Sequence, residues 1–141
     1  GMMVLVVNED RKKISSRIAM ERCVQTSTTF DAWVEKAKED FVDMKIALEN
    51  ADFEKIGAIT EENALAMHAT TTTSTPSFTF LTDESYRAME IVKTSREKGY
   101  RCYFTMDAGP NVKVLYLKED QEKIYEEISK LWQKKIILCM E

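Results

Sequence analysis

The stretch "KKISSR" combines residue types that bind phosphate groups. Lys12, Ser15, Ser16 and Arg17 follow a short apolar run and open a segment with helical spacing. Backbone N–H groups that are free at a helix start can hold a phosphate together with hydroxyls and cations. Serine is also a common helix cap on a solvated surface. The stretch therefore predicts either an anion site or an ordinary helix start.

A second stretch, "YRCYFTMDAGPN", places one carboxylate at the end of a predicted strand. Side chains alternate between two faces over residues 100–107, and Asp107 falls on the wetter face. Gly109 lets a ligand approach the backbone closely, which is a common setting for a catalytic acid or base. An Asx-turn, in which the carboxylate only bonds its own backbone, is the structural alternative.

Other polar residues give weaker signals. His68 is the only histidine, and it lies on the apolar stripe of a predicted helix, which favours a packed core residue. Without a second histidine or an acidic cluster at ligand spacing, no dedicated metal site is expected. The hydroxyls of "HATTTTSTPS" could line a ligand pocket, but a polar loop explains them equally well.

The remaining pattern predicts the elements that position these side chains. Helical periodicity with capping residues predicts helices over residues 14–23, 30–48, 53–68, 83–98 and 119–132. Apolar or alternating runs predict strands over 2–7, 100–107 and 111–117, and 70–81 is expected to be an extended loop. These elements allow an α+β fold, with helices packed on one face of a small, mostly antiparallel sheet.

Composition narrows the class of protein. A chain of 141 residues is the usual size of one domain, so we expect a single domain over residues 1–141. The net charge of −4, with acids and bases interspersed, gives no basic surface for nucleic acid. The longest apolar run, residues 2–7, is far shorter than the roughly 20 residues that a membrane helix needs. Three cysteines without a C-x-x-C pair fit a reduced, cytoplasmic protein.

Several blocks in a fixed order carry a family resemblance. "ISSRIAMERCVQTS", "DFEKIG", "ENALAMHAT", "FTFLTDESYRAM" and "CYFTMDAGPNVKVL" resemble diphosphomevalonate decarboxylase of the GHMP superfamily, above all its Gram-positive bacterial members. The likeness runs from about Val4 to Leu131 and covers the C-terminal half of the family only. It implies the fold of a GHMP C-terminal domain. The sequence departs from the family at "TTTTSTPSFTF" and at "WQKKIILCME".

The resemblance also implies a reaction and site residues. The family uses ATP with Mg²⁺ to phosphorylate mevalonate 5-diphosphate, then releases phosphate and carbon dioxide to give isopentenyl diphosphate. By this resemblance Asp107 matches the catalytic aspartate, Lys12 a lysine that assists phosphoryl transfer, and Ser16 and Arg17 residues that hold the substrate phosphates. With Ser15 beside them, these form the expected substrate-binding group.

The resemblance leaves the activity of the chain open. The family's preceding ATP-binding domain, with its Gly- and Ser-rich loop, is expected to be absent, so the chain alone is expected to be inactive. The surface that the absent domain would cover favours self-association as a homodimer. Alternatives are a noncatalytic folded remnant or dimeric module, and the C-terminal domain of a GHMP small-molecule kinase, although such kinases tend to carry a Gly-rich loop in place of "MDAGPN".

Overall fold

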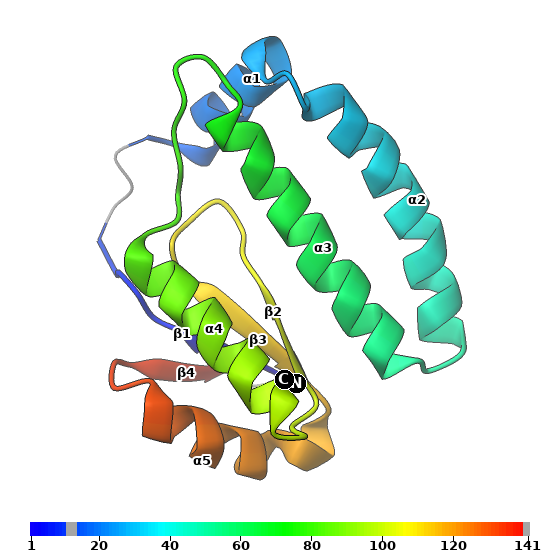
Figure 1. The fold of residues 1–141 in the computed structure, drawn as a ribbon, viewed down its shortest axis with the longest axis vertical. Coiled ribbons are helices and arrows are strands. Elements are labelled where there is room, and N and C mark those ends of the chain that lie inside the picture. Colours follow the sequence, from blue (N-terminus) through cyan, green and yellow to red (C-terminus); the bar gives the residue numbers. More distant parts are fainter. Residues whose placement is uncertain (11–13, 140–141) are drawn as a thin grey trace. The chain divides into compact units, whose positions relative to one another are not determined.

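A computed structural model describes residues 1–10 and 14–139 of the chain (Figure 1). The chain divides into two compact units. The sheet unit comprises Gly1–Glu9 and Leu81–Glu141, and the helical unit comprises Asp10–Phe80. The two ends of the sequence thus belong to one unit, because the first strand pairs with strands formed more than 100 residues later.

The sheet unit contains four strands in the order β2-β3-β1-β4. Every neighbouring pair is antiparallel, with Met3 opposite Val114, Thr105 opposite Lys113 and Leu5 opposite Ile136. Val112, Val114 and Tyr116 are buried while the residues between them are only partly buried, which is the alternation of a strand with one core face. The strands are β1 (Met2–Leu5), β2 (Cys102–Thr105), β3 (Val112–Tyr116) and β4 (Ile136–Cys139).

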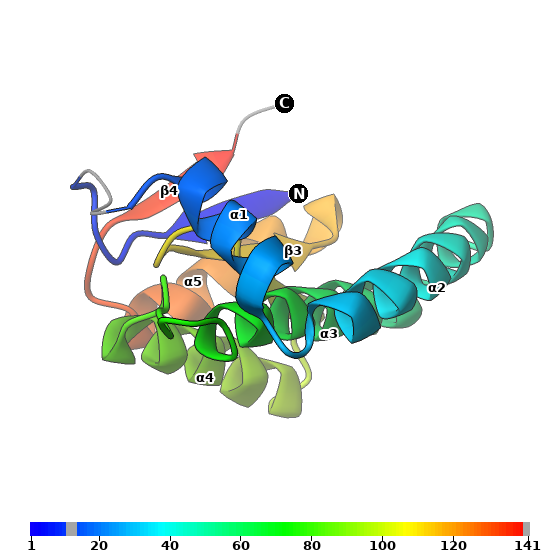
Figure 2. The same cartoon turned by 90° about the horizontal axis from the view of Figure 1, so that it is seen from above.

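Two helices cover one side of this sheet. Figure 2 shows α4 (Asp83–Glu97) and α5 (Gln121–Leu131) on the same side, and a short 3-10 helix, η1 (Lys118–Asp120), precedes α5. Their apolar faces meet the strands in a core that excludes water. Fully buried members of this core include Met3, Leu5, Val92, Phe104, Val112, Val114, Ile124 and Ile128. The predicted α+β class, with helices on one face of an antiparallel sheet, is confirmed.

Capping residues set both ends of α4. The Oγ1 of Thr82 accepts from the backbone N–H of Ser85 at 3.3 Å, and the Oγ of Ser85 accepts from the N–H of Thr82 at 3.0 Å. This reciprocal capping satisfies two donors that a helix start leaves without partners. At the other end Gly99 has φ of 102°, a left-handed conformation that favours glycine. Both ends were predicted from the sequence.

The helical unit consists of α1 (Ser16–Thr26), α2 (Phe30–Glu49) and α3 (Phe53–Thr72). Helices α2 and α3 lie side by side (Figures 1 and 2). Asp52 begins α3 as predicted, since its carboxylate accepts from the N–H of Lys55 at 3.1 Å. Asp40 on α2 accepts from Asn63 on α3 and from Lys36, both at 3.0 Å, so its buried charge is compensated.

Apart from shifts at the ends of elements, the secondary structure differs from the prediction in two places. Residues 70–72 belong to α3 rather than to a loop, and their threonine hydroxyls donate to carbonyls of the preceding turn. The strand β4, at Ile136–Cys139, was not predicted at all. In the described part of the chain, no helix is both long and apolar enough to cross a membrane.

Candidate functional site

Asp107 lies two residues beyond the end of β2, at the entrance to the corner that leads to β3. Its carboxylate oxygen Oδ1 is 2.8 Å from the ammonium Nζ of Lys113. The side chain of Asp107 is 71% exposed, whereas that of Lys113 is only 25% exposed. The carboxylate is therefore accessible to a ligand while one of its oxygens is held by a largely buried lysine.

Four hydrogen bonds hold this corner. The N–H of Gly109 donates to the carbonyl of Asp107 at 2.8 Å. The hydroxyl of Ser85, on α4, donates to the carbonyl of Pro110 at 2.6 Å. The side-chain oxygen of Asn111 accepts from the backbone N–H groups of residues 7 and 8 at 2.8 and 3.0 Å. The corner is thus tied to α4 and to the end of β1, which keeps the exposed carboxylate on a fixed backbone.

The start of α1 shows the predicted cap. Ser15 is the N-cap residue, and its Oγ accepts from the N–H of Ile18 at 3.2 Å. The hydroxyl proton of Ser15 remains available as a donor, because the capping bond uses only a lone pair. The first turn of α1 contains no acidic residue that would repel an anion. Capping and anion binding are therefore compatible here.

Arg17 follows on the surface of the same turn. Its side chain is 89% exposed, and its Nε lies 3.2 Å from the Oε1 of Glu21 one turn later. Such exposed pairs are worth only about 0.3–0.5 kcal/mol, so a phosphate can displace Glu21. Ser16 is partly buried beside it. The predicted residue Lys12 lies outside the described residues.

The structure thus places the predicted site residues in two groups. Ser15, Ser16 and Arg17 gather at one helix start in the helical unit, and Asp107 belongs to the sheet unit. Lys113 is a residue that the sequence analysis missed. Its signal was present, because the hairpin predicted over residues 100–107 and 111–117 brings Lys113 across from the end of the strand that carries Asp107.

His68 and the threonine-rich segment serve the packing of the helical unit. His68 is 5% exposed and meets the ring of Phe80 edge-on, with centroids 6.3 Å apart. The hydroxyl of Thr73 bonds with those of Ser27 and Thr29 at 2.8 and 2.9 Å, which joins the ends of α1 and α3. These contacts favour the structural interpretation of both features. Among residues 1–10 and 14–139, no three His, Cys, Asp or Glu side chains lie where they could share a metal ion.

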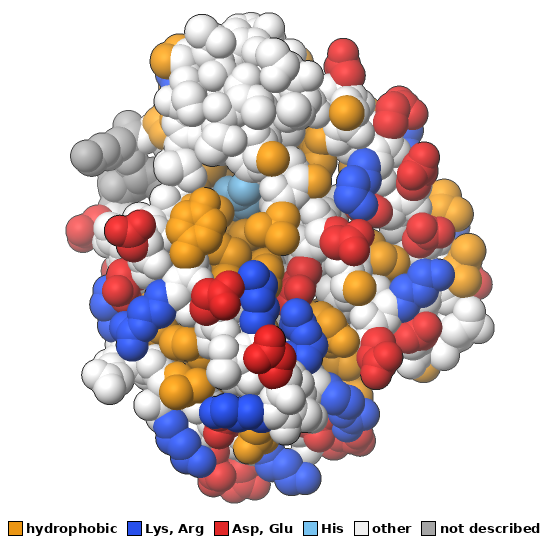
Figure 3. All heavy atoms as spheres, viewed as in Figure 1, with side chains coloured by type: hydrophobic (Ala, Val, Ile, Leu, Met, Phe, Trp, Pro, Cys, Tyr) orange, Lys and Arg blue, Asp and Glu red, His pale blue; other side chains and the backbone are white. Residues whose placement is uncertain are grey.

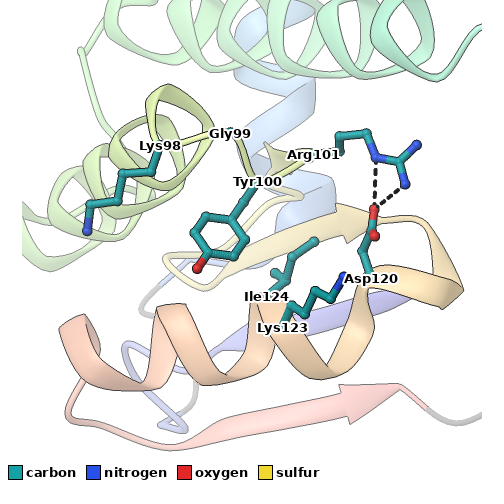
Figure 4. A pocket seen from close by; sticks show the side chains of 7 residues that line it. All are labelled: Lys98, Gly99, Tyr100, Arg101, Asp120, Lys123 and Ile124. Atoms are coloured by element: carbon teal, nitrogen blue, oxygen red, sulfur yellow. Dashed lines mark hydrogen bonds and ion pairs between the residues drawn. The ribbon is translucent and has the colours of Figure 1, made fainter.

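A small cavity of about 210 Å³ lies between the end of α4 and the start of α5 (Figure 4). Two of its three cations have carboxylate partners, because Arg101 contacts Asp120 and Glu119 at 2.7 and 2.8 Å and Lys98 contacts Glu127 at 2.5 Å. The cavity is also smaller than the roughly 300–1,000 Å³ of ordinary ligand pockets. None of the predicted site residues lines it.

Solved structures share this fold. Mevalonate pyrophosphate decarboxylase from Streptococcus pyogenes is 54% identical, with a TM-score of 0.91, and the match covers 96% of this chain and 42% of that one. A structure described as MDDEF in complex with MVAPP, AMPPCP and magnesium is 39% identical, with a TM-score of 0.91 and coverage of 96% and 42%. The fold is therefore that of one part of a mevalonate diphosphate decarboxylase.

Sequence comparison gives the same result. Residues 2–138 match the family described as the mevalonate 5-diphosphate decarboxylase C-terminal domain, and the chain belongs to this family. Diphosphomevalonate decarboxylase from Candida albicans is 31% identical over 123 residues, which are 86% of this chain and 34% of that protein. The chain spans about a third of the length of such curated relatives. The resemblance found in the sequence, including that to Gram-positive members, is confirmed, and it favours the decarboxylase over a small-molecule kinase.

Proposed function

We propose that residues 1–141 act as one domain, the C-terminal domain of an enzyme that converts mevalonate 5-diphosphate to isopentenyl diphosphate with ATP. The observation that carries this proposal is the accessible carboxylate of Asp107 on a corner fixed by Ser85 and Asn111, in a chain of this family. The position, exposure and support of this side chain suit a group that must meet a substrate. A cytoplasmic location stays a prediction.

Asp107 is proposed to act twice in the reaction. It first accepts the proton of the tertiary hydroxyl as that oxygen attacks the terminal phosphoryl group of ATP. Once this proton has passed to water, the carboxylate faces the carbon that becomes electron-poor as phosphate leaves with the electrons of the C–O bond. The bond to the carboxylate group breaks, carbon dioxide departs, and the electrons of that bond form the double bond of the product.

The start of α1 is proposed to hold the diphosphate of the substrate. Ser15 and Ser16 offer hydroxyl donors, Arg17 offers a guanidinium, and the helix start adds its own N–H groups. Lys12 is proposed to neutralise charge during phosphoryl transfer.

ATP and Mg²⁺ belong to the proposal through the family, since a relative is described in complex with AMPPCP and magnesium. The described residues hold no group of three or more metal-binding side chains, so we propose that Mg²⁺ arrives bound to ATP and that another domain holds the nucleotide. Turnover is therefore expected to require that domain, and the 141 residues alone are expected to be inactive. A homodimer remains a further proposal.

The proposal is tested in a chimera. This chain replaces the matching segment of the Streptococcus pyogenes enzyme, and release of carbon dioxide from mevalonate 5-diphosphate is measured with ATP. We expect Asp107→Asn to lower kcat by at least ~10²-fold, with KM nearly unchanged, because the amide cannot take up the proton. Asp43→Asn, at an exposed position on α2, is the matched control.

Two results would contradict the proposal. Normal turnover by Asp107→Asn would mean that Asp107 only shapes the turn, a role that asparagine fills equally well. A chimera that folds but shows no turnover would favour the noncatalytic remnant.

A further inference from the structure

We propose that Lys113 is a positioning residue for Asp107, an inference that rests on the proposed function. The ammonium of Lys113 lies 2.8 Å from Oδ1 of Asp107. This contact fixes one oxygen of the carboxylate in place. Lys113 therefore helps to set the orientation in which Asp107 is presented.

The register of the hairpin explains why these two side chains meet. Thr105 and Lys113 are directly opposite in the antiparallel pair of β2 and β3. Side chains two residues apart on a strand share a face, so Asp107 continues the face of Thr105 beyond the end of β2. A diagonal neighbour of this kind is within reach of a long side chain such as lysine. The contact is thus a consequence of strand pairing.

Lys113 is itself held in place. Its neighbours on β3, Val112 and Val114, are fully buried, which fixes the strand on the core. Only 25% of the lysine side chain is exposed, so its aliphatic part is packed and only its end reaches Asp107. An anchored cation of this kind orients a carboxylate better than a mobile surface lysine would, because less side-chain freedom remains.

A positioning role and a structural role for Lys113 predict effects of different size on turnover and on stability. An ion pair with an exposed partner contributes at most about 1 kcal/mol to stability. Misplacing a catalytic group by about 1 Å can lower a rate by ~10²-fold. Loss of Lys113 is therefore expected to affect turnover far more than folding.

The test uses the chimera described above. We expect Lys113→Met to lower kcat by about tenfold or more, with KM within about twofold and the thermal midpoint nearly unchanged. Lys113→Arg should restore most of kcat, because it returns a cation to the same position. Lys93→Met removes an exposed lysine of α4 and is the control for loss of charge. Lys113→Gln repeats the measurement if the methionine variant fails to fold.

A double variant decides whether Lys113 acts through Asp107. In the Asp107→Asn background, Lys113→Met is expected to lower kcat no further, since there is no carboxylate left to orient. Normal kcat in Lys113→Met and Lys113→Gln, or an equal loss in both backgrounds, would overturn the inference while Asp107 kept its role. Normal kcat in Asp107→Asn alone would instead defeat the proposed function.

Discussion

The hydroxyl of Ser85 donates a hydrogen bond of 2.6 Å to the carbonyl oxygen of Pro110, 25 residues later in the chain. The same hydroxyl oxygen accepts from the N–H of Thr82 at the start of α4. One fully buried side chain therefore joins a helix cap to the corner that follows Asp107. The hydroxyl oxygen of Ser85 therefore takes part both in the cap of α4 and in the support of the candidate site.

Ser85→Ala is accordingly expected to destabilise the chain. The change leaves the carbonyl of Pro110 and the N–H of Thr82 without this partner, and a typical intramolecular hydrogen bond contributes about 0.5–1.5 kcal/mol to stability. Urea denaturation of the 141-residue chain measures the loss in the free energy of unfolding. Ser129→Ala is the matched control, because that hydroxyl donates only to a carbonyl of its own exposed turn in α5. Equal losses in both variants would contradict the assigned role of Ser85.

Arg17→Ala is expected to weaken binding of inorganic diphosphate to the chain by about tenfold or more, since a hydrogen bond to a charged group is worth about 1.5–3 kcal/mol. Calorimetric titration at low salt measures the dissociation constant. Glu21→Gln should strengthen binding slightly, because it releases the guanidinium from its carboxylate partner. Arg22→Ala, later on α1, is the control. Unchanged affinity in Arg17→Ala would place the anion site elsewhere.

The parts of the fold that the sequence predicted are those fixed by local chemistry. Ser15, Asp52 and Thr82 were predicted as caps, and each accepts from the backbone N–H of the third residue of its helix. Such bonds depend on a few neighbouring residues, so a local pattern is enough to find them. The same holds for Gly99, whose left-handed conformation ends α4.

The missed features depend on partners that are distant in the sequence or on competing local effects. The strand β4 pairs with β1 across more than 130 residues, and its residues carry no alternation that would have marked it. The extension of α3 through Thr72 runs against the usual preference of threonine for strands, and the Thr72 hydroxyl donates to the carbonyl of Ala69 in the preceding turn. Lys113 was missed because pairing register, rather than residue type, brings it to Asp107.

Lowering the pH is expected to reduce the stability of the sheet unit, because Glu127 becomes protonated. The hydrogen bond from Lys98 lowers the pKa of Glu127 below its ordinary value of 4.5. A carboxylate with a lowered pKa stabilises the folded state above its ordinary pKa, and this contribution is lost as pH falls through the lower, folded value. Between about pH 6 and about pH 3, the wild type should therefore lose more stability than Glu127→Gln.

Urea midpoints at the two pH values measure this difference. Glu126→Gln, at an exposed neighbouring position, is the control and should follow the wild type. An identical loss in the wild type and Glu127→Gln would show that the contact between α4 and α5 does not respond to protonation of Glu127.

The outer surface of α2 is expected to drive self-association. Phe41 is 67% exposed and Leu48, two turns later, is 59% exposed. Trp33, Val34, Ala37, Lys38 and Phe41 line a groove of about 390 Å³. Figure 3 shows hydrophobic side chains reaching the surface over α2 among charged ones. A stripe of this kind can pack against the same stripe of a second chain across a twofold axis, which makes a homodimer the expected partner.

Phe41→Glu should then weaken the dimer by about tenfold or more, because a carboxylate in the apolar contact would lose its water. Sedimentation equilibrium over a range of concentrations measures the dissociation constant. Tyr86→Glu, at a position 53% exposed on α4, is the matched control and should associate like the wild type. A wild-type chain that stays monomeric at every concentration, or equal weakening by both variants, would rule out α2 as the surface of contact.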